Sequence, residues 1–249
     1  MHRYFVRLSY KGTAYHGWQI QPNAITVQET LQKAFSLLLK EDIAVIGAGR
    51  TDTGVHAINY FAHFELINGI DDLKQLVFKL NRFLKNDIAV HAVFPVKEDI
   101  HARFSAISRT YEYRIHRKKN PFLTDTSLYM YENLDFEAVN SAAKILFDYK
   151  DFTSFSKLHT DTKTNFCKII RAECIQRGEQ YIFIIEADRF LRNMVRAITG
   201  TLLDVGRKKI SENDFRKIIE SKNRSAAGVS VPAHGLFLTE IKYPENIRL

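Results

Sequence analysis

The chain has 249 residues, 45% of them apolar, so it can bury a sizeable core as one large domain or two small ones. Its 36 Lys and Arg residues exceed its 28 Asp and Glu residues, and the resulting net charge of +8 favours an anionic partner such as nucleic acid. The N-terminal residues lack the apolar core of a signal peptide, and no apolar run approaches the roughly 20 residues of a membrane span. We therefore expect a cytoplasmic protein without a membrane partner.

The first half of the chain has the spacing of alternating strands and helices. Period-two alternation predicts a strand over residues 3–9. Thr26 and Glu29 have the spacing of a capping box, and the apolar positions that follow predict a helix to about Leu39. A strand over residues 43–46 then leads into a glycine-rich turn. After it we predict a strand to residue 66, a helix over 73–83 and a strand over 88–94.

The second half has the same order with different lengths. We predict a strand over 107–116, a helix after Asp135, paired strands over 168–176 and 181–187, helices over 191–205 and after Ser211, and a closing strand over 235–242. Both halves thus read as split βαββαβ units. We expect an α+β fold of two ferredoxin-like halves, residues 1–105 and 106–249, whose antiparallel sheets are flanked by helices, with a ligand cleft at their junction.

The cysteines and histidines do not indicate a disulfide or a metal site. Cys167 and Cys174 lie in one predicted strand at an odd spacing, so their side chains should face opposite sides. No Cys and His residues have the spacing of zinc ligands. We expect free cysteines and no bound metal.

The stretch GAGRTDTGVHA, residues 47–57, surrounds one Asp and one Arg with glycines. Glycines permit unusual backbone conformations and close approach by a ligand, so Asp52 and Arg50 are candidates for an exposed reactive turn. The alternative is that Asp52 only caps its own turn. Dinucleotide-binding and P-loop motifs are excluded, because Asp52 occupies the third glycine position of G-x-G-x-x-G and no Gly-Lys-Ser/Thr follows.

The triplet Asp52-Thr53-Gly54 also has the sequence of an aspartic protease turn. A single copy would require a homodimer, and the neighbouring Arg50 would hold Asp52 ionised, whereas the protease dyad shares one proton. The protease hypothesis predicts peptide cleavage and indifference to tRNA.

Two later segments could complete a site around Asp52. In the predicted strand after residue 107, Tyr111 could face a cleft or simply pack on the sheet. Arg192 and Arg196 lie four residues apart in a predicted helix, where such a stripe is ordinarily solvated. Arg196 stands between Val195 and Ala197, so it is expected to be partly buried and to need a carboxylate partner such as Asp52.

Four ordered segments together resemble the TruA family of tRNA pseudouridine synthases: GRTDTGVHA at 49–57, HARFSAISRTYEYRI at 101–115, FLRNMVR at 190–196 and PAHGLFL at 232–238. The resemblance spans almost the whole chain. It implies two ferredoxin-like halves, a homodimer that binds tRNA across both subunits, and no cofactor. It also implies isomerisation of uridines 38, 39 and 40 in the tRNA anticodon stem-loop.

The resemblance implies a role for each matching residue. Asp52 matches the catalytic aspartate, and Arg196 matches the basic residue paired with it. Tyr111 matches the tyrosine that stacks on the target base, and Arg50 matches the arginine that helps to displace that base. Extruding a base costs a few kcal/mol, which favours such an aromatic surface and basic contacts to phosphates.

A further segment is similar to an RNA-contacting loop of the family and contains His101, Arg103 and Phe104. Many family members carry Arg near the position of Cys167, so the RNA contacts of residues 152–168 stay open. The competing function is a non-catalytic tRNA-binding module. It accounts for the basic charge but not for an Asp-centred turn, because a carboxylate repels phosphate.

Overall fold

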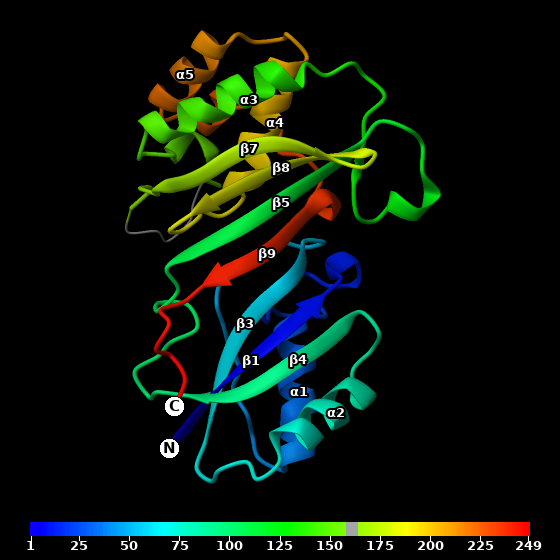
Figure 1. The fold of residues 1–249 in the computed structure, drawn as a ribbon, viewed down its shortest axis with the longest axis vertical. Helices are drawn as coiled ribbons and strands as arrows, with labels where there is room; N and C mark the ends of the chain where they lie inside the picture. The colour runs from blue at the N-terminus through cyan, green and yellow to red at the C-terminus, as the bar shows by residue number, and fades with distance from the viewer. Residues whose placement is uncertain (158–163) are drawn as a thin grey trace. The chain divides into compact units, whose positions relative to one another are not determined.

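The computed structural model describes residues 1–157 and 164–249 of the chain. The chain forms two compact units, whose elements are drawn in Figure 1. The first unit contains Met1–Ile107 and Leu238–Leu249, and the second contains Ser108–Phe237. Part of the segment 152–168, whose RNA contacts the sequence leaves open, lies outside the described residues.

The first unit is built on a central strand with partners on both sides. Its elements are β1 (His2–Tyr10), α1 (Val27–Leu39), β2 (Ile46–Gly47), β3 (His56–Leu66), α2 (Leu73–Phe83) and β4 (Ile88–Val96). β1 pairs antiparallel with β3 and β4, and the short β2 pairs antiparallel with β3. The last strand of the chain, β9 (Leu236–Lys242), is the other neighbour of β3. The strand predicted over residues 3–9 therefore has an antiparallel partner on each side.

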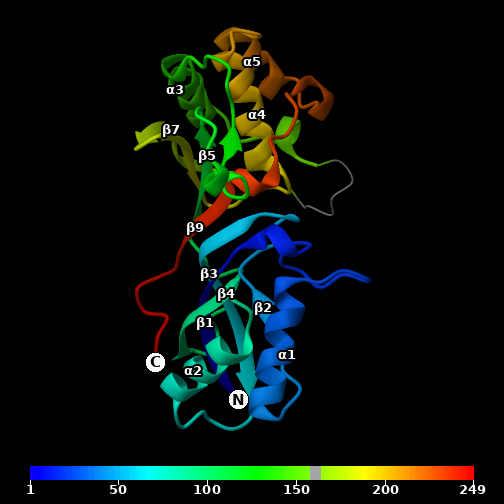
Figure 2. The same cartoon turned by 90° about the vertical axis from the view of Figure 1, so that its right-hand side faces the viewer.

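The core of the first unit joins helices to the sheet. Leu31 and Phe35 of α1 are fully buried, and the Phe35 ring lies 4.5 Å from the ring of Phe64 in β3. α1 and α2 contact each other, and α2 contacts β4 (Figure 2). Burying each such side chain stabilises the fold by about 1.5–3 kcal/mol. Because strand side chains alternate between faces, this buried face also fixes the register of the sheet.

The helix after Thr26 forms as predicted, but only half of its capping box does. The Thr26 hydroxyl accepts from the Glu29 N–H, whereas the Glu29 carboxylate pairs with Lys33 at 2.5 Å. The strand predicted over residues 43–46 is wrong for most of its length, since β2 begins at Ile46. Side chains of α1 satisfy this backbone instead: Ser36 accepts from the Ile43 N–H at 2.9 Å, and Gln32 accepts from the Val45 N–H at 3.0 Å.

In its described residues, the second unit combines four strands with a separate group of helices. Its elements are β5 (Ser108–His116), β6 (Leu128–Tyr129), α3 (Phe136–Lys144), β7 (Ile169–Arg177), β8 (Gln180–Ala187), α4 (Met194–Gly206) and α5 (Glu212–Glu220). β8 pairs antiparallel with β5 and β7, and β6 runs parallel to the end of β5. The helices α3, α4 and α5 contact one another, and α3 contacts β7 (Figure 2). The predicted α+β class is confirmed.

The helix predicted over residues 191–205 begins later, at Met194, because Asn193 has a left-handed conformation with φ of 67°. The prediction that Arg192 and Arg196 form a basic stripe on one helix is therefore wrong. Arg192 precedes the helix, and its carbonyl oxygen accepts from the Lys157 N–H at 3.0 Å. Only Arg196 belongs to α4.

Both cysteines are free and buried. Cys174 lies in β7, but Cys167 precedes that strand, so the prediction that one strand carries both is wrong. The Cys167 N–H donates to the Lys150 carbonyl oxygen at 2.9 Å, outside the ladder of β7 and β8. Among the helices of the described residues, none has the length and apolar content that crossing a bilayer requires.

Candidate active site

Asp52 begins a tight turn between β2 and β3. The Val55 N–H donates to the Asp52 carbonyl oxygen at 3.1 Å and closes the turn. Gly54 has φ of +80°, a conformation that residues with a Cβ rarely adopt, so this turn needs a glycine at that position. The glycine-dependent turn expected from the sequence is present.

Tyrosine hydroxyls on β1 and β3 bond the residues on both sides of Arg50, the side chain of Thr51 and the backbone of Gly49. The Tyr10 hydroxyl and Thr51 Oγ1 are joined by a hydrogen bond of 2.9 Å. The Tyr60 hydroxyl donates to the Gly49 carbonyl oxygen and lies 3.3 Å from the Gly49 nitrogen, whose N–H donates to it. The sequence predicted neither contact, because both tyrosines occupy ordinary apolar positions of strands. Only the pairing of those strands places them under the turn.

Trp18 forms the buried side of this support. Its ring stacks on Tyr60 with centroids 4.2 Å apart, and its backbone N–H donates to the Thr51 carbonyl oxygen at 3.3 Å. A Cβ at Gly47 would lie 2.3 Å from both Trp18 Nε1 and the Tyr60 hydroxyl. Gly47 therefore lets the aromatic pair reach the backbone, and the turn rests on a closely packed aromatic base.

The side chains of the turn differ in exposure. Thr51 is buried, Asp52 is half-buried, and Arg50 and Thr53 are exposed. A half-buried carboxylate on a rigid turn can act as a nucleophile or a base. The exposed guanidinium of Arg50 is available to an anionic ligand.

Tyr111 lies in β5, opposite Ile185 of β8, and is half-buried. Its ring meets Phe190 edge-on, with centroids 5.1 Å apart and an interplanar angle of 89°. Tyr113 is fully buried, and its hydroxyl donates to the Pro232 carbonyl oxygen at 2.9 Å. Of these two tyrosines on one face of β5, Tyr111 keeps exposed ring surface on which a base could stack.

Arg196 is half-buried in the first turn of α4, as the sequence predicts. Its Nε donates to the Val231 carbonyl oxygen at 2.8 Å, and its own carbonyl oxygen accepts from the Val231 N–H at 3.2 Å. A Cβ at Gly200 would lie 1.9 Å from the Val229 carbonyl oxygen, so the segment that holds Arg196 runs directly against the helix. Burial raises the pKa of Tyr113, and the charge of Arg196 opposes that rise.

The loop after Ile100 presents a cation beside an aromatic ring. The guanidinium carbon of Arg103 lies 5.4 Å from the centroid of Phe104, and both side chains are exposed. His101 Nδ1 accepts from the N–H groups of Arg103 and Phe104 at 3.0 and 3.3 Å. The Nδ1 atom of His101 therefore stabilises the backbone conformation of the loop.

His63 of β3 lies beneath the same loop, and no sequence motif indicates a role for it. Its Nδ1 accepts from the Ala102 N–H at 3.2 Å, while the Tyr243 hydroxyl donates to the Ala102 carbonyl oxygen at 2.5 Å. Burial, together with the charges of His101 and Arg3, lowers the pKa of His63 to about 4. A neutral His63 and the C-terminal segment thus hold the loop from two sides.

The predicted site residues form three groups in the chain. Asp52 and Arg50 share a turn of the first unit, His101, Arg103 and Phe104 share a loop of the same unit, and Tyr111 and Arg196 lie in the second unit.

A family model described as tRNA pseudouridine synthase matches residues 8–105 and 142–244. The chain is 56% identical to tRNA pseudouridine synthase A of Bacteroides fragilis, over 98% of each chain. It is 53% identical to the protein of the same name from Parabacteroides distasonis, over 99% of this chain and 98% of that protein. The identity to tRNA pseudouridine synthase A of Porphyromonas gingivalis is 51%, over 100% of both chains.

Proposed function

The chain belongs to the TruA family of tRNA pseudouridine synthases, isomerases that act on uridine in tRNA, and on that premise we propose that it modifies uridines 38, 39 and 40 of the anticodon stem-loop. The observation that carries the proposal is the Asp52 turn. A half-buried carboxylate stands there on a turn held by the Tyr10 hydroxyl at the Thr51 side chain and by the Tyr60 hydroxyl at the Gly49 backbone. Such rigidity suits a group that must meet one atom of an extruded nucleotide.

Asp52 is the catalytic carboxylate in this proposal. Isomerisation breaks the bond from N1 of the base to C1' of the ribose, turns the base, and joins C5 to C1'. The hydrogen at C5 then leaves as a proton, and N1 takes up a proton. Asp52 serves either as the nucleophile at C1' or as the base at the adjacent sugar carbon. Atoms and electrons balance without an oxidant or a group donor.

Arg196, Tyr111 and Arg50 have supporting roles. Arg196 supplies the positive charge that pairs with the Asp52 carboxylate and orients it, and the bond from its Nε to the Val231 carbonyl oxygen fixes the direction of its guanidinium. Tyr111, which is half-buried, offers its ring to the target base, and the exposed Arg50 contacts the RNA that the base leaves. His101, Arg103 and Phe104 contribute the RNA-binding loop, in which His101 shapes the backbone and the other two reach outward.

Two ferredoxin-like halves are part of the proposal. In the first unit, β2 and β3 are neighbours and β1 separates β3 from β4, an arrangement consistent with a βαββαβ unit. In the second unit, β5, β8 and β7 are neighbours in that order. Functionally, residues 1–105 carry the Asp52 turn and residues 106–249 supply Tyr111 and Arg196. The enzyme is proposed to work in the cytoplasm as a homodimer. Sedimentation would measure the mass of that assembly.

The first experiment follows tritium release from tRNA labelled at C5 of uridine, because joining C5 to C1' expels that hydrogen. Wild type should release tritium, and Asp52→Asn should not, since the amide keeps the size of the carboxylate but lacks its charge. The variant should keep much of its tRNA affinity, which depends on phosphate contacts. Salt-sensitive tRNA binding with no release by wild type would instead support a non-catalytic binding module.

Arg196→Met tests the supporting charge. We expect turnover to fall, because a neutral side chain no longer attracts and orients the reacting carboxylate. Arg196→Lys keeps the charge and should retain more activity than Arg196→Met. An unchanged rate in Arg196→Met would contradict the assigned role.

A further inference from the structure

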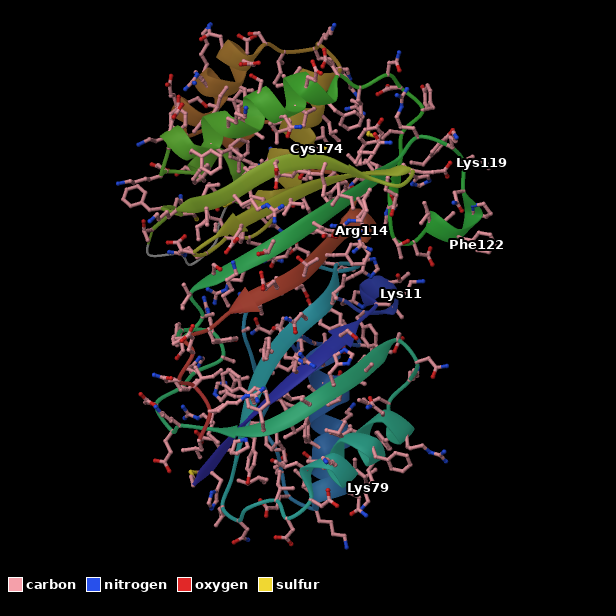
Figure 3. The ribbon with its side chains drawn as sticks, in the orientation of Figure 1. Lys11, Lys79, Arg114, Lys119, Phe122 and Cys174 are labelled. Carbon is pink, nitrogen blue, oxygen red and sulfur yellow. The ribbon has the colours of Figure 1, made fainter. Side chains whose placement is uncertain are left out.

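The loop of residues 117–131, between β5 and α3, has no role in the mechanism above, and we call it the Phe122 loop. Its Phe122 is 91% exposed, and its Tyr131 is 77% exposed. A phenyl ring that exposed adds little to the stability of the fold, because its apolar surface stays in water. Figure 3 places Phe122 and Lys119 on this loop, which extends away from β5.

The turn that carries Phe122 is locally rigid. Pro121 fixes its own φ, and the Asn120 side-chain oxygen accepts from the Phe122 N–H at 2.9 Å. The Leu123 N–H donates to the Asn120 carbonyl oxygen at 3.2 Å, and the Thr124 hydroxyl donates to the Pro121 carbonyl oxygen at 3.1 Å. The exposed ring therefore stands on a preorganised turn rather than on a free coil.

The base of the loop is tied to β5. The Met130 N–H donates to the His116 carbonyl oxygen at 2.9 Å, and a buried hydrogen bond of 2.9 Å joins His116 Nδ1 to Ser127 Oγ. The strand β6 adds parallel pairing to the end of β5. Since both ends of the excursion are held, a ligand that binds Phe122 loses little additional loop entropy.

The loop also carries positive charge next to its exposed ring. Lys118 and Lys119 are both exposed. Lys118 pairs with Glu179 at 3.2 Å, but these side chains are 82% and 65% exposed, so water screens the pair strongly. Both ammonium groups are thus accessible to a polyanion.

We propose that the Phe122 loop is a second RNA-contact surface, at which Phe122 stacks on an unpaired base of tRNA and Lys118 and Lys119 contact its phosphates. Exposed aromatic rings beside lysines are the combination that binds single-stranded nucleic acid. Lysine is depleted in the buried centres of protein interfaces, so the same residues fit a protein partner less well. This inference rests on the proposed function for the identity of the RNA.

The test measures the Kd of unmodified tRNA for the full-length protein. Phe122→Ala should weaken binding about 5-fold to 150-fold, and Phe122→Trp, which can still stack, should restore it. Lys119→Gln should lower the slope of log affinity against log salt by about 0.7 to 0.9 for each lost phosphate contact. Matched controls on α2 are Phe78→Ala, at a ring 64% exposed, and Lys79→Gln, drawn in Figure 3; neither should change binding.

Two results would overturn the inference: an unchanged Kd in Phe122→Ala, or an equal loss of affinity in Phe78→Ala. If Phe122→Ala left the Kd unchanged but altered sedimentation, the loop would instead contact a second copy of the chain. Tritium release by wild type is recorded in parallel. Weaker binding in Phe122→Ala without any release by wild type would support the loop as an RNA surface and contradict the proposed isomerisation sites. Release by wild type with unchanged binding in Phe122→Ala would support the proposed isomerisation and contradict the loop as an RNA surface.

Discussion

At the scale of single residues, the Asp52 turn depends on groups that never meet the substrate in the proposed mechanism. Both backbone polar groups of Gly49 are bonded to the Tyr60 hydroxyl, which accepts from the Gly49 N–H and donates to the Gly49 carbonyl oxygen. A side chain at position 47 would collide with the same hydroxyl, because a Cβ on Gly47 would lie 2.3 Å from it. Small displacements of a reacting carboxylate are costly in rate, so these contacts should affect turnover more than affinity.

Tyr60→Phe tests this dependence. Removing the hydroxyl should lower kcat for tritium release about tenfold or more, because a misplaced reacting group is expensive. The tRNA Kd should stay unchanged, since no phosphate contact is lost. Tyr4→Phe is the matched control: its hydroxyl is also bonded to a backbone N–H, that of Ile70 at 3.0 Å, but remote from the turn in sequence. Equal losses of kcat in both variants would indicate general destabilisation instead.

At the scale of elements, the loop with Arg103 and Phe104 takes its shape from a histidine in the neighbouring strand. His63 is 2% exposed and accepts from the loop at Ala102. A protonated ring would carry a hydrogen on Nδ1 and could no longer accept there. The packing of the loop on β3 is therefore coupled to pH.

The sign of that coupling follows from the pKa of His63, which burial lowers from 6.5 to about 4. Between these values the unfolded chain binds more protons, so the free energy of unfolding should rise with pH. The stabilisation is fully present above about pH 6.5 and is lost as pH falls through about 4, for a total on the order of 3 kcal/mol.

Urea unfolding across this pH range would measure the effect. His63→Asn keeps an acceptor near the position of Nδ1 without titrating, so its stability should depend less on pH. His16→Asn is the control, because His16 is an exposed histidine of the same unit. A pH dependence in His63→Asn as steep as that of wild type would exclude His63 as the group responsible.

At the scale of the whole molecule, the chain closes the first unit with its last residues. The Tyr243 ring packs edge-on against Phe5 and Phe61, with centroids 5.2 Å away in each case. The Lys97 N–H donates to the Ile247 carbonyl oxygen at 3.2 Å. The first unit is therefore assembled from both ends of the sequence.

Deleting residues 243–249 should loosen the first unit selectively. Hydrogen exchange is expected to accelerate in β1, β3 and β4, because the rings of Phe5 and Phe61 lose a partner and Ala102 loses a hydrogen bond. Exchange in β7 and β8 should stay slow. Uniform acceleration in both units would show that they unfold together.

The sequence by itself determined the elements whose periodicity is long, the glycine-dependent Asp52 turn and the family, since these depend on local spacing and on ordered motifs. The half-buried position of Arg196 also followed from its apolar neighbours. Local spacing misplaced the strand before Gly47, because side chains of α1 take its backbone hydrogen bonds. Local spacing also predicted that the helix of Arg196 begins at residue 191. The helix begins at Met194, because Asn193 has a left-handed conformation.

Only the tertiary structure decided which strand residues support the Asp52 turn and the loop that carries Arg103 and Phe104. Tyr60 and His63 lie three residues apart in β3 and have no local signal of their roles. Their partners come from other parts of the chain, Gly49 in one case and Ala102 in the other. The assignment of residues 238–249 to the first unit was equally invisible in the sequence, since a strand pattern specifies alternation but not the strand beside it.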